Sequence, residues 1–507
     1  MAVQLSKDSL REQYVGKTLN DVITPQVVLD LAKVEANCNL MLEAAERLQL
    51  SWRAHIKTHK TEELTRLQVG DKSSSPVNLI VSTIIEAEKL IPLLKEYQQN
   101  GRKVNVLYSF PLYPSCIPRL SAVSAALGAG ALSVMVDHVA QVPHLTTLTT
   151  SSGNPPLVFL KVDVGGHRAG VIPDTPSCSA LISALLASET EGNSVLLGVY
   201  SHAGHSYASR KDWEAMNYLS QEFEGLRKVA EQVKAQRAPG RDPLVLSVGA
   251  TPTATTIQHP DLVETTNGTT NGTTNGTTNG TTNGVAATAA ITNGNGTNGH
   301  VKQADILTPV PTTHLKTLLK TLKSSNFALE VHAGVYPTLD IQQLCAHARD
   351  STSLNASYIA ITVLAEICSL YPSRSPTSST EALINAGCIA LGREPVADLG
   401  SPKGQSYVGW GVLMPWGDLT DLPAPDAGFP LKHEGWEVAS LSQEHGILRW
   451  AGKAEEEVAL QVGQRVRVWP NHSCITGAAH AYYLVVDSRN KGREDEVVDV
   501  WVRWNGW

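Results

Sequence analysis

Long apolar runs, a leader-like N-terminus and an excess of positive charge are all missing from this sequence. No apolar run approaches the roughly 20 residues that a helix needs to cross a bilayer, so we expect no membrane span. Residues 1–14 are polar and carry acids as well as bases, unlike a signal or transit peptide. The formal net charge of -7 argues against a nucleic-acid partner, which calls for a basic surface.

Cysteine pairs are missing as well. The seven cysteines are odd in number and scattered without paired spacing, which predicts reduced thiols in a cytoplasmic protein. Charged residues make up 18% of the chain and hydrophobic residues 42%, as in a globular protein rather than a disordered or fibrous one. A chain of 507 residues exceeds one ordinary hydrophobic core, so we expect two or more domains.

Short apolar runs alternate with helical stretches over the first two thirds of the chain, which predicts repeated strand–helix units and a parallel sheet. Eight or so units suggest a closed (β/α)₈ barrel of the TIM type, with its site at the C-terminal ends of the strands. We expect strands at 77–81, 104–108, 132–136, 156–164, 196–202, 244–249 and 328–331, and a first strand or its approach at 24–30.

The pattern of the sequence changes after residue 354, where short apolar or alternating runs are separated by Gly, Pro and Asp. This pattern predicts an antiparallel β domain. Strands are expected at 358–363, 387–391, 408–413, 436–438, 446–450, 465–469, 481–486 and 497–504. The predicted division is an N-terminal extension (1–23), a barrel (24–353) and a C-terminal β domain (354–507).

The barrel region carries an insert at 262–303 that includes five consecutive copies of Thr-Thr-Asn-Gly. It holds almost no apolar residues that could offset the entropy of ordering, so we predict a disordered loop. Its deletion should leave kinetics and melting temperature nearly unchanged.

Candidate chemistry first occurs at 53–61, where two histidines alternate with two lysines. A lysine whose pKa is lowered by burial or nearby cations can form a Schiff base with a carbonyl, including that of pyridoxal phosphate. In an extended segment His55, Lys57 and His59 would share one face. A basic, polar stretch of this length is more often solvated surface, so this pattern alone leaves both interpretations open.

Segment 53–61 resembles the lysine segment of the eukaryotic D-serine dehydratase and D-threonine aldolase family, whose members have an alanine-racemase-like barrel. The family usually has Pro where this chain has Ala54. Further matching segments follow in order at 81–83, 163–170, 198–207, 247–253, 332–334 and 470–474. Together they cover nearly the whole chain except the insert.

The resemblance implies pyridoxal phosphate as cofactor, bound to Lys57, which would also act in catalysis. By the same resemblance Arg168 points toward the ring oxygen of the cofactor, and Tyr200 and Tyr207 contact cofactor or substrate. His202 is a candidate acid/base group or a partner of the substrate carboxylate.

The resemblance also assigns phosphate binding to Thr251, Gly334 and Val335, in late loops where barrels often hold phosphate. Small residues let backbone N–H groups approach an anion, although Ser, Gly and Thr are also ordinary turn residues. Much of the family has Asn where this chain has Val335, so only a backbone contact would survive there.

His472 and Cys474 form the second candidate centre, because both side chains are zinc ligands and i and i+2 of an extended segment face the same way. Two protein ligands leave positions for water and substrate, which suits catalysis better than a structural zinc site. In the family the dehydratases carry His-x-Cys here and the D-threonine aldolases His-x-Asp.

The sequence therefore predicts a pyridoxal phosphate- and zinc-dependent D-serine dehydratase, expected to be a homodimer with a small-molecule substrate. Two alternatives stay open: a D-threonine aldolase that cleaves β-hydroxy D-amino acids, and a non-catalytic protein that binds pyridoxal phosphate. Proteins of the second kind lack the β domain and its metal pair, so residues 354–507 count against it.

Overall fold

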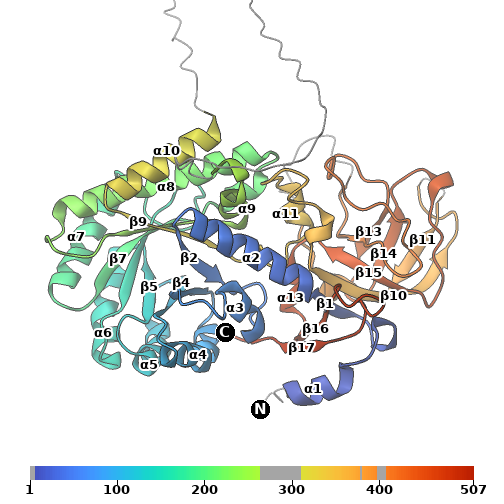
Figure 1. Ribbon diagram of the computed structural model, residues 1–507, viewed down its shortest axis with the longest axis horizontal. Helices are drawn as coiled ribbons and strands as arrows, with labels where there is room; N and C mark the ends of the chain where they lie inside the picture. The colour runs from blue at the N-terminus through green and yellow to red at the C-terminus, as the bar shows by residue number, and fades with distance from the viewer. Residues whose placement is uncertain (1–5, 263–309, 377–378, 397–406) are drawn as a thin grey trace, which may run out of the picture.

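The protein is described by a computed structural model, which covers residues 6–262, 310–376, 379–396 and 407–507. Apart from residue 262, the insert expected at 262–303 lies outside the described residues. In Figure 1 a barrel surrounded by helices occupies the left of the molecule. A sheet built mainly from the C-terminal third of the chain lies at the right.

Eight parallel strands, β2 to β9, close into a barrel, as the alternation of strands and helices predicted. The strands are β2 (Ser51–His55), β3 (Val77–Val81), β4 (Val104–Pro111), β5 (Leu132–Val136), β6 (Leu157–Lys161), β7 (Val195–Tyr200), β8 (Val245–Val248) and β9 (Ala328–Ala333). The helices around them are α2 (Leu31–Arg47), α3 (Glu62–Gln68), α4 (Ile84–Gln99), α5 (Ile117–Leu127), α6 (Val142–Ser152), α7 (Pro176–Thr190), α8 (Asp212–Gln236) and α10 (Pro311–Ser324).

Helix α8 shows how the apolar period of the sequence becomes a barrel layer. Its buried side chains recur at steps of three and four, while charged residues fill the opposite face. The buried apolar positions include Leu219, Phe223, Leu226, Ala230 and Val233. Throughout the described ranges, no helix combines the length and the apolar character needed to cross a membrane.

A second, nine-stranded sheet has the order β11-β14-β13-β12-β15-β10-β1-β16-β17 and is antiparallel except where β1 lies parallel to β16. Its strands are β1 (Gln26–Asp30), β10 (Ile361–Tyr371), β11 (Glu381–Ile384), β12 (Gly411–Leu413), β13 (Trp436–Leu441), β14 (Gly446–Trp450), β15 (Arg465–Pro470), β16 (Tyr482–Val486) and β17 (Asp499–Val502). The expected C-terminal β domain is thus present.

Strand β1 differs from the expectation, because it belongs to this second sheet and not to the barrel. It lies between β10 and β16, with Val27, Val28 and Leu29 fully buried. A strand that is buried on both faces has a continuous apolar run, and such a run fits the interior of either sheet. The sequence pattern alone therefore could not show which sheet contains this strand.

The prediction of a strand at 387–391 is also wrong. Residues Cys388–Leu391 form a single helical turn, α12, which is bracketed by Gly387 and by Gly392 with φ of +79°. An apolar run this short does not distinguish a strand from a helical turn. Strand β11 was not expected from the sequence.

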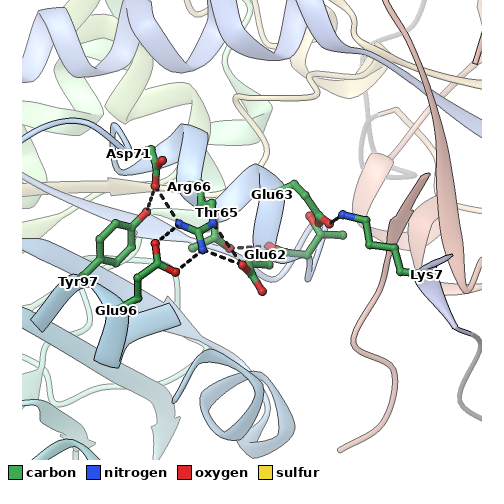
Figure 2. A network of polar contacts seen from close by, with 9 residues as sticks. Lys7, Glu62, Glu63, Thr65, Arg66, Asp71, Glu96 and Tyr97 are labelled. Carbon is green, nitrogen blue, oxygen red and sulfur yellow. Dashed lines mark hydrogen bonds and ion pairs between the residues drawn. The ribbon is translucent and has the colours of Figure 1, made fainter. Parts of the chain in front are cut away.

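Polar contacts tie the first helices to one another and to the N-terminal helix α1 (Lys7–Tyr14), as Figure 2 shows. Arg66 of α3 binds Asp71 at 3.1 Å and Glu96 of α4 at 2.5 Å, and Lys7 pairs with Glu63. Each exposed pair contributes little alone, but a network of several charges fixes α3, which directly follows the segment of Lys57.

Candidate active site

Lys57 lies two residues beyond the end of β2, at the C-terminal end of the barrel, in a turn of residues 57–59. Its side chain is half-buried and, within the described ranges, forms neither a hydrogen bond nor an ion pair. Its backbone N–H donates to Nδ1 of buried His55 at 3.4 Å, and Ser82 Oγ lies 3.4 Å from Nε2 of the same ring. A half-buried lysine without an anionic partner suits a role in binding a carbonyl compound.

His59 does not share the face of Lys57, contrary to the expectation for an extended segment. The strand ends at His55, and the turn that follows directs His59 into the protein, toward Thr61 at 3.1 Å and Gln68 at 2.9 Å. Burial lowers the pKa of His59 to about 3, so this ring is a neutral structural group.

The β domain holds the turn of Lys57 through three successive backbone carbonyl groups. Such bonds satisfy buried acceptors and fix the direction of the turn. The donors are Tyr483 Oη to Thr58 O at 3.3 Å, Arg503 Nε to His59 O at 3.1 Å and Trp504 N to Lys60 O at 2.8 Å.

Cys474 of the candidate metal pair meets this same turn within one chain, because its Sγ lies 3.1 Å from Thr58 Oγ1. His472 is extended, as expected, but Cys474 lies in the first turn of α13 (Ser473–Ala478). Burial alone would lower the pKa of His472, but hydrogen bonding to Cys474 raises it to about 9. Burial alone would raise the pKa of the Cys474 thiol, but His472 lowers it. The two side chains therefore lie close enough to influence each other's protonation.

Asp340 positions this pair from the barrel side. It precedes α11 (Ile341–Cys345), where its Oδ1 accepts from Gln343 N at 2.9 Å. Its Oδ2 accepts from the backbone N–H of Ser473 at 2.9 Å and from its hydroxyl at 2.8 Å. Because Ser473 stands between His472 and Cys474, the loop after β9 fixes the segment that carries both.

The donor chemistry of the pair fits a zinc ion. Imidazole and thiolate are ligands that zinc prefers, and buried Nδ1 of His472 has no hydrogen-bond partner in the described ranges. No group of three or more His, Cys, Asp or Glu residues that could hold a metal occurs in that part of the chain. The pair, as described, would leave coordination positions open.

His202 lies across the barrel mouth on the loop after β7. Its Nδ1–H donates to Gly249 O at 2.7 Å, which leaves Nε2 as the free nitrogen of the ring. Burial, followed by the charges of Lys57 and Arg168, lowers the pKa of His202 to about 3, so the imidazole is neutral. Tyr200, the last residue of β7, stacks on His332, with centroids 4.3 Å apart and planes at 6°.

The loops after β8 and β9 carry glycines where the chain packs closely against neighbouring residues. A Cβ on Gly249, whose φ is +148°, would lie 2.1 Å from His332 O, and one on Gly334 would lie 3.2 Å from His55 Cβ. The N–H of Val335 donates to Thr251 Oγ1 at 3.1 Å, so these two predicted residues lie together. Phosphate binding by these residues stays a prediction.

Arg168 and Tyr207 border the same region. Arg168 is exposed, and its charge, after burial, helps to lower the pKa of Lys161 to about 8. Burial raises the pKa of half-buried Tyr207, the charge of Cys474 adds to the rise, and hydrogen bonding with Thr251 opposes it. Tyr207 thus lies close enough to both Thr251 and Cys474 to respond to them.

Three residues of this site were not identified from the sequence: Lys161, Glu222 and Asp340. Lys161 ends β6, and its Nζ lies 5.9 Å from the centroid of the Tyr200 ring. Asp340 and Glu222 act through hydrogen bonds to segments distant in the sequence. A lone acidic residue has no local spacing that would reveal such contacts. Only the position of Lys161 at the end of a predicted strand could have indicated it.

Comparison with known protein families divides the chain as the fold does. Residues 29–265 match the family described as "Alanine racemase, N-terminal domain", and residues 360–486 match "Putative serine dehydratase domain". The first match covers most of the barrel, and the second covers most of the sheet that carries the His472 and Cys474 pair.

Full-length relatives are also found. The chain is 34% identical to a D-serine dehydratase of Schizosaccharomyces pombe. The matched region covers all of this chain and 97% of that protein. The chain is 30% identical to one of Saccharomyces cerevisiae, covering 98% and 99%. Among solved structures, a D-threo-3-hydroxyaspartate dehydratase from Delftia sp. HT23 has the same fold, with a TM-score of 0.65, 24% identity and coverage of 97% and 100%.

Proposed function

This chain belongs to the D-serine dehydratase family and is a lyase, and we propose that it converts D-serine to pyruvate and ammonia with pyridoxal phosphate and zinc. The observation that carries the proposal is the 3.1 Å contact between Cys474 Sγ and Thr58 Oγ1. It joins the candidate metal pair to the turn of Lys57, where removal of a proton and loss of a hydroxyl group must occur side by side. Location in the cytoplasm and a homodimer stay predictions.

Lys57 would hold pyridoxal phosphate through its amine, with Thr251, Gly334 and Val335 at the phosphate and Arg168 near the ring oxygen. Tyr200 and Tyr207 would border the cofactor or substrate. When bound, this cofactor supplies an electron-withdrawing ring that makes the Cα proton of an amino acid acidic. The half-buried amine of Lys57 is unpaired in the described ranges, so it is available both to bind and to take that proton.

His202 is well suited to contact the substrate carboxylate. Its ring is neutral, and the bond from Nδ1–H to Gly249 O fixes its orientation and leaves Nε2 without a hydrogen bond among the described residues. A carboxylate placed beside Nε2 would stabilise the protonated imidazole, so the ring could take a proton on binding.

His472 and Cys474 would hold zinc beside Thr58, with Asp340 fixing the segment between them. When bound there, zinc supplies a Lewis acid for a leaving hydroxyl group. The thiolate of Cys474 is a softer ligand than the aspartate of the aldolases, and it therefore favours zinc over manganese or magnesium.

The test is to measure pyruvate from a panel of D- and L-β-hydroxy amino acids, with and without a chelator. We expect D-serine to give pyruvate. Chelation should lower the rate by at least about 100-fold, since a Lewis acid contributes several kcal/mol to such a step. The visible absorbance of the cofactor should persist, because Lys57 needs no metal to bind it.

Variants of the pair sharpen this test. His472→Ala should behave like the chelated enzyme, and Cys474→Asp should lose dehydration and gain cleavage of D-threonine to glycine and acetaldehyde. Cys368→Asp, at an exposed cysteine of the same sheet, is the matched control and should change neither activity. If the unmodified, zinc-loaded enzyme forms glycine from D-threonine far faster than pyruvate from D-serine, the aldolase alternative is correct. If neither product forms while the cofactor is bound, the non-catalytic alternative stands.

A further inference from the structure

Glu222 is a buried carboxylate that the proposed chemistry does not use. It lies in the middle of α8, is fully buried and, among the described residues, has no ion-pair partner. Burial raises its pKa to about 7 despite the hydrogen bonds that it accepts. A buried acid without a cation is costly, so its contacts must offset that cost.

Those contacts converge on the two loops that hold His202. Oε1 of Glu222 accepts from Ser201 Oγ at 3.0 Å and from Ala203 N at 2.9 Å, the residues directly before and after His202. The same oxygen accepts from Gly249 N at 3.2 Å. Oε2 accepts from Thr253 Oγ1 at 3.0 Å.

Gly249 completes the connection, because its carbonyl oxygen accepts the Nδ1–H of His202 at 2.7 Å. One carboxylate oxygen thus fixes both neighbours of His202 and the residue whose carbonyl selects its tautomer. A Cβ at position 249 would lie 2.1 Å from His332 O, so only glycine fits at this position of the loop.

We propose that Glu222 is a positioning residue that holds His202 in the Nδ1–H tautomer, with Nε2 directed at the substrate. This assignment rests on the proposed function for its effect on turnover, but its effect on the geometry of His202 is independent of that function. What matters is the reach of the side chain, since an oxygen at the position of Oε1 is enough to accept all three bonds.

Two substitutions separate reach from charge. Glu222→Gln keeps the length and one acceptor oxygen, and its amide can donate to Thr253 Oγ1. Glu222→Asp keeps the carboxylate but withdraws it by one methylene from the loops. Glu231→Gln and Glu231→Asp are matched controls, because Glu231 lies on the same helix and is exposed.

The test is to determine a crystal structure of each variant with bound pyridoxal phosphate and to measure its kcat and KM for D-serine. For Glu222→Gln we expect the 2.7 Å contact between His202 and Gly249 to persist, with kcat within about threefold of the unmodified enzyme. For Glu222→Asp we expect that contact to exceed about 3.5 Å, with kcat lowered about 10- to 100-fold. The cofactor should stay bound in both.

Three results would overturn the proposal. If Glu222→Asp keeps both the contact and the turnover, the carboxylate is only a structural link. If Glu222→Gln loses turnover while Glu222→Asp retains it, charge and not reach is the property in use. Failure of Glu222→Gln to fold would likewise contradict it. Lack of pyruvate from D-serine in the unmodified enzyme would instead count against the proposed function, and the crystal structures would still decide the role of Glu222.

Discussion

At the residue scale, the difference between Lys57 and Lys60 shows what the turn after β2 does. Lys60 pairs with buried Glu86 at 3.0 Å, whereas Lys57 has no charged partner in the described part of the chain. We predict that Lys57→Ala loses both the visible absorbance of pyridoxal phosphate and all pyruvate formation. Lys60→Ala should keep the absorbance and lose only stability, because burying Glu86 without a cation is unfavourable.

Absorbance spectra and a thermal melt of the two variants check this prediction. Colour that is retained in Lys57→Ala and lost in Lys60→Ala would show that the wrong lysine was assigned.

The residues of the site differ in how far the sequence could reveal them. Lys57, Thr251 and Val335 stand in segments with recognisable spacing, and the structure brings them to one end of the barrel. His59 was misplaced, because the alternation of faces holds only while the strand continues and β2 ends at His55. Glu222 could not be found, since its four donors come from loops that meet only in the folded protein.

At the element scale, the barrel strands could be predicted because parallel strands are covered on both faces and read as short apolar runs between helices. Strand β1 has the same kind of run, yet it pairs with β10 and β16, and only the folded chain shows which sheet it enters. The position of the metal pair could not be predicted either, because it depends on how α13 packs against the turn of residues 57–59.

Two of the three donors to this turn, Arg503 and Trp504, directly follow β17, and this leads to a prediction about Arg503. Its Nε donates to His59 O at 3.1 Å, and the residue is buried. Arg503→Met would leave that carbonyl unsatisfied, so we expect the free energy of unfolding to fall by about 1–3 kcal/mol. Pyridoxal phosphate should bind more weakly, because the turn of Lys57 would be less well fixed.

Urea denaturation and a titration with the cofactor measure both effects. The control is Arg493→Met, which removes an exposed pair with Glu496 and should cost less than about 1 kcal/mol. If Arg503→Met binds the cofactor as tightly as the unmodified protein, the contact from Arg503 to His59 O does not position Lys57.

At the scale of the whole molecule, the barrel and the second sheet depend on each other, since β1 precedes the barrel in the sequence but lies inside the second sheet. Without residues 354–507, β1 would lose both neighbouring strands and expose Val27, Val28 and Leu29. Each of these side chains contributes about 1.5–3 kcal/mol when it is buried. The turn of Lys57 would also lose its three donors.

We therefore predict that residues 1–353 alone neither fold stably nor bind pyridoxal phosphate. Co-expression with residues 354–507 as a separate chain should restore the visible absorbance, because β1 then regains β10 and β16. Circular dichroism and cofactor absorbance of the fragment, alone and with its complement, measure the outcome. A stable, yellow fragment 1–353 would show that the barrel holds its cofactor unaided, and the second sheet would then serve the metal pair alone.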